Sequence, residues 1–133
     1  MIAMNRRTRI FVCREPTDMR SSYDSLLERS KAVFKKDPFT GHLFVFVNSH
    51  RTSMKAIYYD GTGLVIVAKR LEKSRFSMIN PRYRGHPTLT QAEFNLFFEG
   101  ANLEKRFIDS PVEVKRKSMI RKIQKISETV LAN

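Results

Sequence analysis

The stretch from Asp37 to Ile79 constrains the fold most, because three dense apolar segments and a fourth, shorter one are separated there by turn-forming residues. The segments are rich in β-branched and aromatic residues, and each has the length of a single strand. We expect strands over four ranges: Leu43–Val47, Ser53–Tyr59, Leu64–Arg70 and Arg75–Ile79. The short loops between them favour hairpins, so the simplest sheet is an antiparallel β-meander.

The loop lengths also predict the register of this meander. Hairpins closed between the nearest strand ends would give three facing pairs: Val47 with Ser53, Tyr59 with Leu64, and Arg70 with Arg75. Side-chain alternation then places an almost wholly apolar set on one face: Phe44, Phe46, Met54, Ala56, Tyr58, Val65, Val67, Lys69, Phe76 and Met78. The other face mixes aliphatic, aromatic and basic side chains: Leu43, Val45, Val47, Lys55, Ile57, Tyr59, Leu64, Ile66, Ala68, Arg70, Arg75, Ser77 and Ile79. We expect helices to pack on the apolar face and the mixed face to meet a partner.

Further signals flank the meander. The β-branched run Ile10–Cys13 predicts a short first strand. Apolar residues fall on one helical face from Ser21 to about Lys36, and Pro38 and Gly41 follow. Thr90 and Glu93 have the spacing of a capping box, which opens a helix that ends at Gly100. The expected fold class is therefore α+β, with a meander of four to five strands packed on one face by helices.

A basic C-terminal helix is expected beyond this domain. Ser110, Pro111 and Glu113 form a helix start, and the apolar residues Met119 and Ile123 begin a stripe with alternating spacings of four and three. Three arrangements fit this pattern: a coiled-coil seam that makes a homodimer, a basic helix lying on a partner, or a helix folded over the mixed face of the sheet. We divide the chain into one α+β domain over residues 1–103 and a helical extension over residues 104–133.

The net charge indicates the class of partner. The 133 residues include 25 Lys and Arg against 13 Asp and Glu, which gives +12 at pH 7 and favours a polyanion such as DNA. The excess is spread along the chain, so no single segment supplies it. The sharpest local candidate is the expected hairpin tip over residues 69–76, where four cations lie beside Phe76; a solvated turn is the alternative interpretation. The candidate DNA-contacting residues are Arg51, Lys55, Tyr59, Lys69, Arg70, Lys73, Arg75, Lys115, Arg116, Lys117, Arg121 and Lys122.

No pattern of catalytic or metal-binding residues is evident in the sequence. The three histidines lie on separate segments without ligand spacing, and Cys13 is the only cysteine, so we expect no cofactor and no metal. Four aspartates could converge as a nuclease site, but each has a local role at a helix start or a turn: Asp18, Asp24, Asp37 and Asp60. The N-terminus lacks the apolar core of a signal peptide, and no run is long enough to span a bilayer. We expect a soluble, cytoplasmic protein with no membrane partner.

Several motifs in order resemble one known family. They are TDMR at residues 17–20, DPFTGHLFVF at 37–46, YDGTG at 59–63 and KRLEKSRF at 69–76, followed by Leu89-Thr90 with Leu96, Glu99 and Gly100. Together they resemble the TnpB-type accessory proteins of bacterial transposons of the insertion sequence 66 family, over roughly residues 8–103. The RNA-guided nuclease that shares the TnpB name is a different protein. The chain departs from the family pattern at Ser21, where lysine is usual, in the arginine-poor segment 47–50, and in the extension over residues 104–133.

The resemblance implies a bacterial protein that accompanies a separate transposase and is needed for DNA transposition. It carries over no catalytic residues. Our leading hypothesis is a non-enzymatic accessory protein that helps assemble the transposase with the DNA at the ends of the element. The alternative is an adaptor that docks on the transposase without direct DNA contact.

Overall fold

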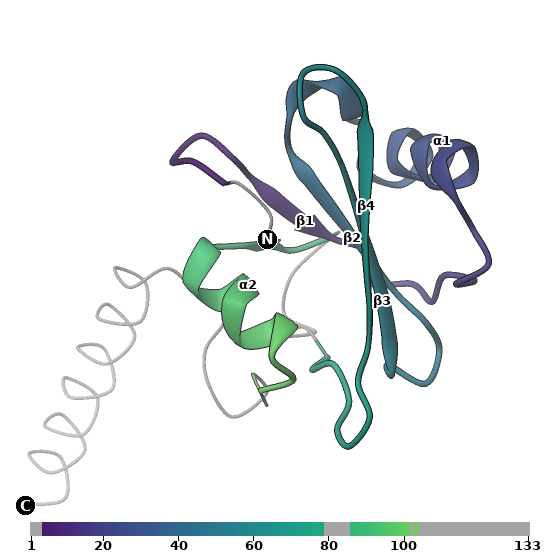
Figure 1. Cartoon of the computed structure of the whole chain (residues 1–133), viewed down its shortest axis with the longest axis vertical. Coiled ribbons are helices and arrows are strands. Elements are labelled where there is room, and N and C mark those ends of the chain that lie inside the picture. The colour runs from purple at the N-terminus through teal and green to yellow at the C-terminus, as the bar shows by residue number, and fades with distance from the viewer. Residues whose placement is uncertain (1–3, 79–85, 102, 104–133) are drawn as a thin grey trace, which may run out of the picture.

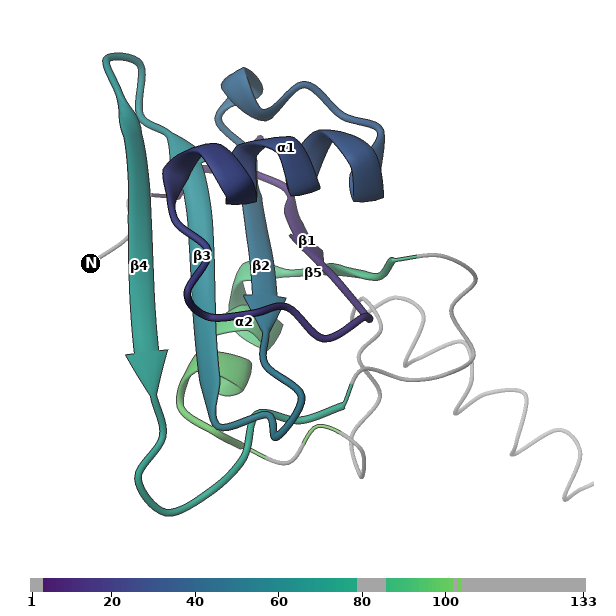
Figure 2. The same ribbon diagram turned by 90° about the vertical axis from the view of Figure 1, so that its right-hand side faces the viewer.

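The computed structural model of the chain describes residues 4–78, 86–101 and 103. It contains five strands, two α-helices and one 3-10 helix, in the order β1 (Ile10–Val12), α1 (Tyr23–Phe34), η1 (Pro38–Thr40), β2 (Leu43–Val47), β3 (Ser53–Tyr59), β4 (Leu64–Arg70), β5 (Thr88–Leu89) and α2 (Gln91–Phe98). The strands form one sheet in the order β4-β3-β2-β1-β5; Figure 1 shows the whole chain, and Figure 2 labels all five strands. The predicted α+β class is confirmed, and so are the bounds of the three strands from Leu43 to Arg70.

The sheet is mixed, which corrects the expectation of a purely antiparallel meander. β2, β3 and β4 are antiparallel neighbours, but β1 pairs with β2 in parallel and β5 pairs antiparallel with β1. Parallel neighbours need a long crossover, and residues 13–42 provide one that contains α1. The first strand therefore has an interior position in the sheet, between β2 and the edge strand β5.

The helices cover both faces of the sheet, so the prediction that they pack on one face was wrong. Figure 2 shows α1 in front of the sheet and α2 behind it. On the α1 face, Leu26 and Phe34 pack with Phe44, Phe46 and other buried side chains. On the α2 face, Phe94 and Phe97 pack against a second cluster that includes residues of β1, β2 and β3. A sheet that is apolar on both sides needs a helix on each.

The observed register of β2 against β3 differs by one residue from the predicted register. This difference explains why each predicted face combined residues that lie on opposite faces of the observed sheet. Tyr59 pairs with Leu64 as predicted, but Val47 pairs with Met54 instead of Ser53. The turn closes one residue earlier, because Asn48 N–H donates to the Ser53 carbonyl at 3.0 Å. The shift by one residue moves all of β2 to the other face, since side chains alternate along a strand. Phe44 and Phe46 therefore lie beneath α1, on the face that includes Lys55.

The expected strand Arg75–Ile79 is absent from residues 75–78, and Ile79 lies outside the described residues. Residues 71–78 form a loop, so Arg70 and Arg75 do not face each other across a hairpin. Phe76 is completely buried and stacks on Phe97 of α2, with 5.1 Å between the ring centroids. This aromatic side chain anchors the loop to the core and is not exposed at a tip.

The predicted helices are present with slightly shorter bounds. α1 occupies the middle of the expected range, with Asp24 in its first turn and Lys31 in its last, where both charges suit the helix dipole. The capping box of α2 is confirmed: Glu93 N–H donates to Thr90 Oγ1 at 3.1 Å, and Thr90 N–H donates to Glu93 Oε1 at 2.9 Å. The predicted helix beyond Ser110 lies outside the described residues.

Candidate nucleic-acid interface

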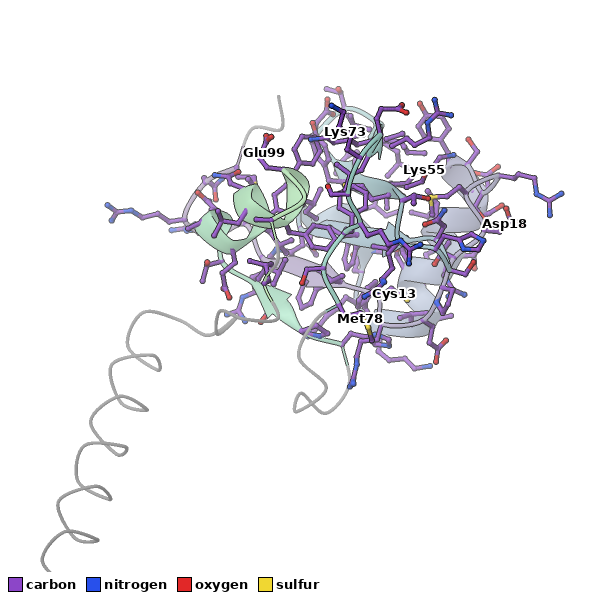
Figure 3. All side chains as sticks on the ribbon, turned by 90° about the horizontal axis from the view of Figure 1, so that it is seen from below. Cys13, Asp18, Lys55, Lys73, Met78 and Glu99 are labelled. Carbon is purple, nitrogen blue, oxygen red and sulfur yellow. The ribbon has the colours of Figure 1, made fainter. Side chains whose placement is uncertain are left out.

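Three loops meet at one end of the sheet, and we call this region the loop end. It comprises residues 13–16 after β1, residues 48–52 between β2 and β3, and residues 71–77 after β4. The strand directions bring them together, because β1 and β2 are parallel and β4 is antiparallel to β3. Figure 3 looks onto this end of the molecule, with Cys13 and Met78 in the lower part of the view and Lys73 near its upper margin.

The loop over residues 48–52 is held by the side chain of Asn48. Its carboxamide oxygen accepts hydrogen bonds from Thr52 N–H at 2.9 Å and Ser53 N–H at 3.1 Å, and its nitrogen donates to Thr52 Oγ1 at 3.1 Å. Arg51 completes the turn in the left-handed region, with φ of 58°. Such a conformation is uncommon for a residue other than glycine. The hydrogen bonds of Asn48 hold the turn in this conformation and so fix the position of the Arg51 backbone.

The loop over residues 71–77 is tied to the same turn by the backbone. Leu71 N–H donates to the Thr52 carbonyl at 2.8 Å, and Phe76 N–H donates to the Arg51 carbonyl at 2.6 Å. The buried ring of Phe76 also attaches this loop to α2, because it stacks on Phe97. Two loops that are distant in sequence therefore form one connected surface.

This surface carries more cations than carboxylates. Within the described residues, the cationic side chains of the loop end and of the adjoining last residue of β4 are Arg14, Arg51, Arg70, Lys73 and Arg75. The carboxylates in the same loops are Glu15 and Glu72. Glu72 accepts from Arg70 at 3.2 Å, but both side chains are about three-quarters exposed, so water screens this pair. The loop end and the adjoining Arg70 therefore carry a net positive formal charge.

A cavity of about 460 Å³ opens at the loop end, beside the carboxyl ends of the parallel strands β1 and β2. Val12, Val47 and Phe97 give it an apolar floor. The remaining lining residues come from the three loops and their borders: Cys13, Arg14, Glu15, Pro16, Asn48, Ser49, Arg51, Ser77 and Met78. Crevices at the carboxyl ends of parallel strands are common ligand sites. This hollow combines an apolar base with two guanidinium groups among its lining residues.

Two of the predicted DNA-contacting lysines are used within the fold. Lys55 Nζ donates to the Ser21 carbonyl at 2.8 Å on the α1 face. Lys69 Nζ donates to the Phe98 carbonyl at 2.7 Å on the α2 face, and it lies 4.1 Å from the centre of the Phe98 ring. These lysines stabilise the chain before α1 and the end of α2, and the structure does not bring them together.

Tyr59 lies at the end of the sheet opposite the loop end. Its hydroxyl donates to the Gly61 carbonyl at 2.8 Å, and its ring packs edge-on to Phe39. Of the candidates, the structure thus gathers Arg51, Arg70, Lys73 and Arg75, and their contact with DNA stays a prediction. The candidates Lys115, Arg116, Lys117, Arg121 and Lys122 lie outside the described residues.

The sequence interpretation did not include Arg14 or the cavity. Both depend on the parallel pairing of β1 with β2, which brings residue 14 beside the turn that follows β2. The available signal was the helix-containing crossover between the first two strands, since this pattern is typical of parallel pairing.

The four aspartates of the nuclease hypothesis have local roles, and Asp24 lies in the first turn of α1. Asp18 binds Arg20 at 2.7 Å, and hydrogen bonds from the Arg20 side chain and backbone lower the Asp18 pKa to about 2. Asp37 accepts from Phe39 N–H at 3.0 Å to cap η1. Hydrogen bonds from Thr62 and Gly63 lower the pKa of Asp60 in its turn. Within the described residues, no three His, Cys, Asp or Glu side chains are grouped so that they could hold a metal ion.

Neither helix in the described part of the chain has the length and apolar character that crossing a bilayer would require.

The thiol of Cys13 is buried at the base of the loop end and contacts the Glu15 carbonyl at 3.4 Å. A buried thiol in such surroundings is typical of a structural cysteine.

Comparisons with known proteins identify the family. The model of the IS66 Orf2-like proteins matches residues 8–107, which include every described strand and helix. The uncharacterized protein y4jC of Sinorhizobium fredii is 31% identical over 100 residues, covering 75% of this chain and 85% of that protein. The uncharacterized protein y4hO of the same organism is 36% identical over 76 residues, covering 57% of this chain and 66% of that protein. No solved structure matches the chain. The family expected from the ordered motifs is confirmed: the chain belongs to the IS66 Orf2-like protein family.

Proposed function

We propose that the protein is a non-enzymatic accessory factor of DNA transposition that binds DNA through the loop end and engages the transposase of the same element. The observation that carries the DNA-binding part is the placement of Arg51, Lys73 and Arg75 on two loops joined by backbone hydrogen bonds, with Arg70 adjoining them at the end of β4. The net charge of +12 and the family membership support the same proposal.

The chemistry of the loop end favours contact with phosphates over reading of bases. Guanidinium and ammonium groups neutralise phosphates and release condensed counterions, which makes binding strongly salt-dependent. Four such groups predict a slope of about −4 in a plot of log K against log salt concentration, from about −0.9 for each phosphate neutralised. Phosphate contacts of this kind position a protein on DNA without specifying sequence.

The test is fluorescence anisotropy with labelled duplex DNA over a salt series, on the full chain and on two double variants. Lys73→Ala with Arg75→Ala removes two exposed loop-end charges, and Arg6→Ala with Arg7→Ala removes two exposed charges from the segment before β1. We expect the loop-end variant to bind about tenfold or more weakly and to reduce the slope by about 2, whereas the control keeps most of the affinity. Equal losses in both variants would show that net charge alone drives binding and would refute the role of the loop end.

A second candidate is the adaptor that docks on the transposase without touching DNA. It is favoured by the apolar floor of the cavity and by Met78, which lines the cavity and is 53% exposed. A pull-down of the transposase after nuclease treatment separates the two functions. Retained capture by a chain that shows no salt-dependent DNA binding would favour the adaptor.

A further inference from the structure

The outer edge of β4 is a long strand edge. All seven residues of β4 pair with β3, from Ser53↔Arg70 to Tyr59↔Leu64. In the described part of the chain no strand pairs with its other side, and Figure 2 shows β4 at the margin of the sheet. The opposite margin is formed by β5, which has only two residues. The two edges of this sheet therefore differ greatly in the length of backbone that they present.

The β4 edge lacks the devices that usually prevent pairing between molecules. Native edges are commonly protected by charges, proline, bulges or very short strands. The segment Leu64–Ala68 contains no charged residue, proline or glycine, and its register with β3 is regular throughout. Lys69 does not serve as such a charge, because its ammonium group is bound to the Phe98 carbonyl on the α2 face. The first four side chains of β4 are only half-buried and Ala68 is exposed, so apolar surface accompanies the unpaired backbone.

The charges at the two ends of β4 favour a second copy of the same chain in antiparallel orientation. The turn before β4 carries Asp60, whose carboxylate is held by Thr62 and Gly63 N–H groups, and β4 ends at Arg70, whose exposed pair with Glu72 is screened by water. Antiparallel pairing would bring the acidic end of each copy beside the basic end of the other. Parallel pairing would instead place Arg70 next to Arg70, which is unfavourable.

The side chains of β4 also suit a two-fold axis at Val67. Ala68 of one copy would then lie opposite Ile66 of the other, and both belong to the α1 face. Val67 would meet Val67 on the α2 face, so apolar side chains would be paired on both faces. We propose that two copies of the chain pair through β4 to form one continuous sheet, with α1 helices on one face and α2 helices on the other.

Sedimentation velocity on the full chain tests the proposal across a wide concentration range. Each copy carries +12, so we expect dimerisation to strengthen as salt screens the repulsion between copies. Ala68→Lys places a charge in the middle of the edge. Ala92→Lys is the matched control, because it adds the same charge at an exposed position of α2. We expect the wild type and Ala92→Lys to dimerise, and Ala68→Lys to weaken dimerisation by at least about tenfold.

Hydrogen exchange on the wild type keeps the proposal falsifiable even if Ala68→Lys does not fold. The alternate amides of residues 64–70 that point away from β3 should exchange more slowly as the concentration rises into the dimer range, while those of α2 should not change. Three results would overturn the proposal: a wild type that stays monomeric at every concentration, dimers that resist Ala68→Lys but disappear when residues 104–133 are removed, and protection of these outward amides that is independent of concentration. The last result would mean that this edge is covered by another segment of the same chain.

Discussion

Truncation of Phe76 distinguishes sharply between an aromatic tip that meets DNA and an aromatic anchor that belongs to the core. The side chain has no exposed surface and stacks on Phe97 with 5.1 Å between ring centroids. Replacing a fully buried Phe by Ala typically costs about 3–5 kcal/mol, because lost transfer energy and an unfilled cavity add. We expect Phe76→Ala to lie in this range, which is a large share of the roughly 5–15 kcal/mol that stabilises a domain.

The assay is chemical denaturation followed by circular dichroism, with Phe76→Leu as a milder variant in case Phe76→Ala unfolds. The matched control is Phe39→Ala, since Phe39 is 47% exposed and should lose about 1 kcal/mol or less. Removing the anchor should also loosen the loop over residues 71–77 and weaken DNA binding, although no charge is lost. A cost below about 1 kcal/mol for Phe76→Ala would refute the anchor and restore the exposed-tip interpretation.

Three further predictions follow from single contacts. Gly100 has φ of +79°, and an added Cβ would lie 2.6 Å from a serine hydroxyl in the loop over residues 71–77, so Gly100→Ala should lower the free energy of unfolding by about 1–3 kcal/mol in the same denaturation assay. Lys69→Met keeps the stem but removes the hydrogen bond and ring contact to Phe98, and should cost about 1–2 kcal/mol, whereas a loss within error would show that these contacts are unimportant. Burial lowers the pKa values of His42 and His86 below 6.5, so the stabilisation that depends on their neutral forms should be fully present above pH 6.5 and should be lost as the pH drops toward the lowered values. A melting temperature that is constant from neutral to mildly acidic pH would contradict this.

The histidine prediction has a geometric basis in the hydrogen bonds at the two ends of the interior strand β1. His42 Nδ1 accepts from Arg9 N–H just before β1, and His86 Nδ1 accepts from Arg14 N–H just after it, both at 3.1 Å. A ring nitrogen that accepts a hydrogen bond must be unprotonated, so protonation would break a contact at each end of the strand. Substituting both histidines should therefore flatten the pH dependence of the melting temperature.

The features of the fold that the sequence predicted correctly are determined by residues that lie close together in the sequence. The strand bounds between Leu43 and Arg70 and the capping box at Thr90 follow from local composition and spacing. The register of β2 does not, because the Asn48 side chain binds two backbone amides and shortens the turn. The parallel position of β1 and the burial of Phe76 likewise depend on partners that are distant in sequence.

The difference between local and long-range interactions also decides how much of the candidate site could be predicted from the charged residues in the sequence. Sequence identifies cations but not what each one binds, and a lysine stem is long enough to reach a carbonyl on a distant segment. Lys55 and Lys69 do this across 34 and 29 positions of the chain, so two of the six predicted cations within the described residues are bound inside the fold. Counting all six as phosphate contacts gives a salt slope of about −5, whereas the four at the loop end give about −4. A slope near the larger value that is unchanged by loss of Lys73 and Arg75 would place DNA elsewhere on the molecule.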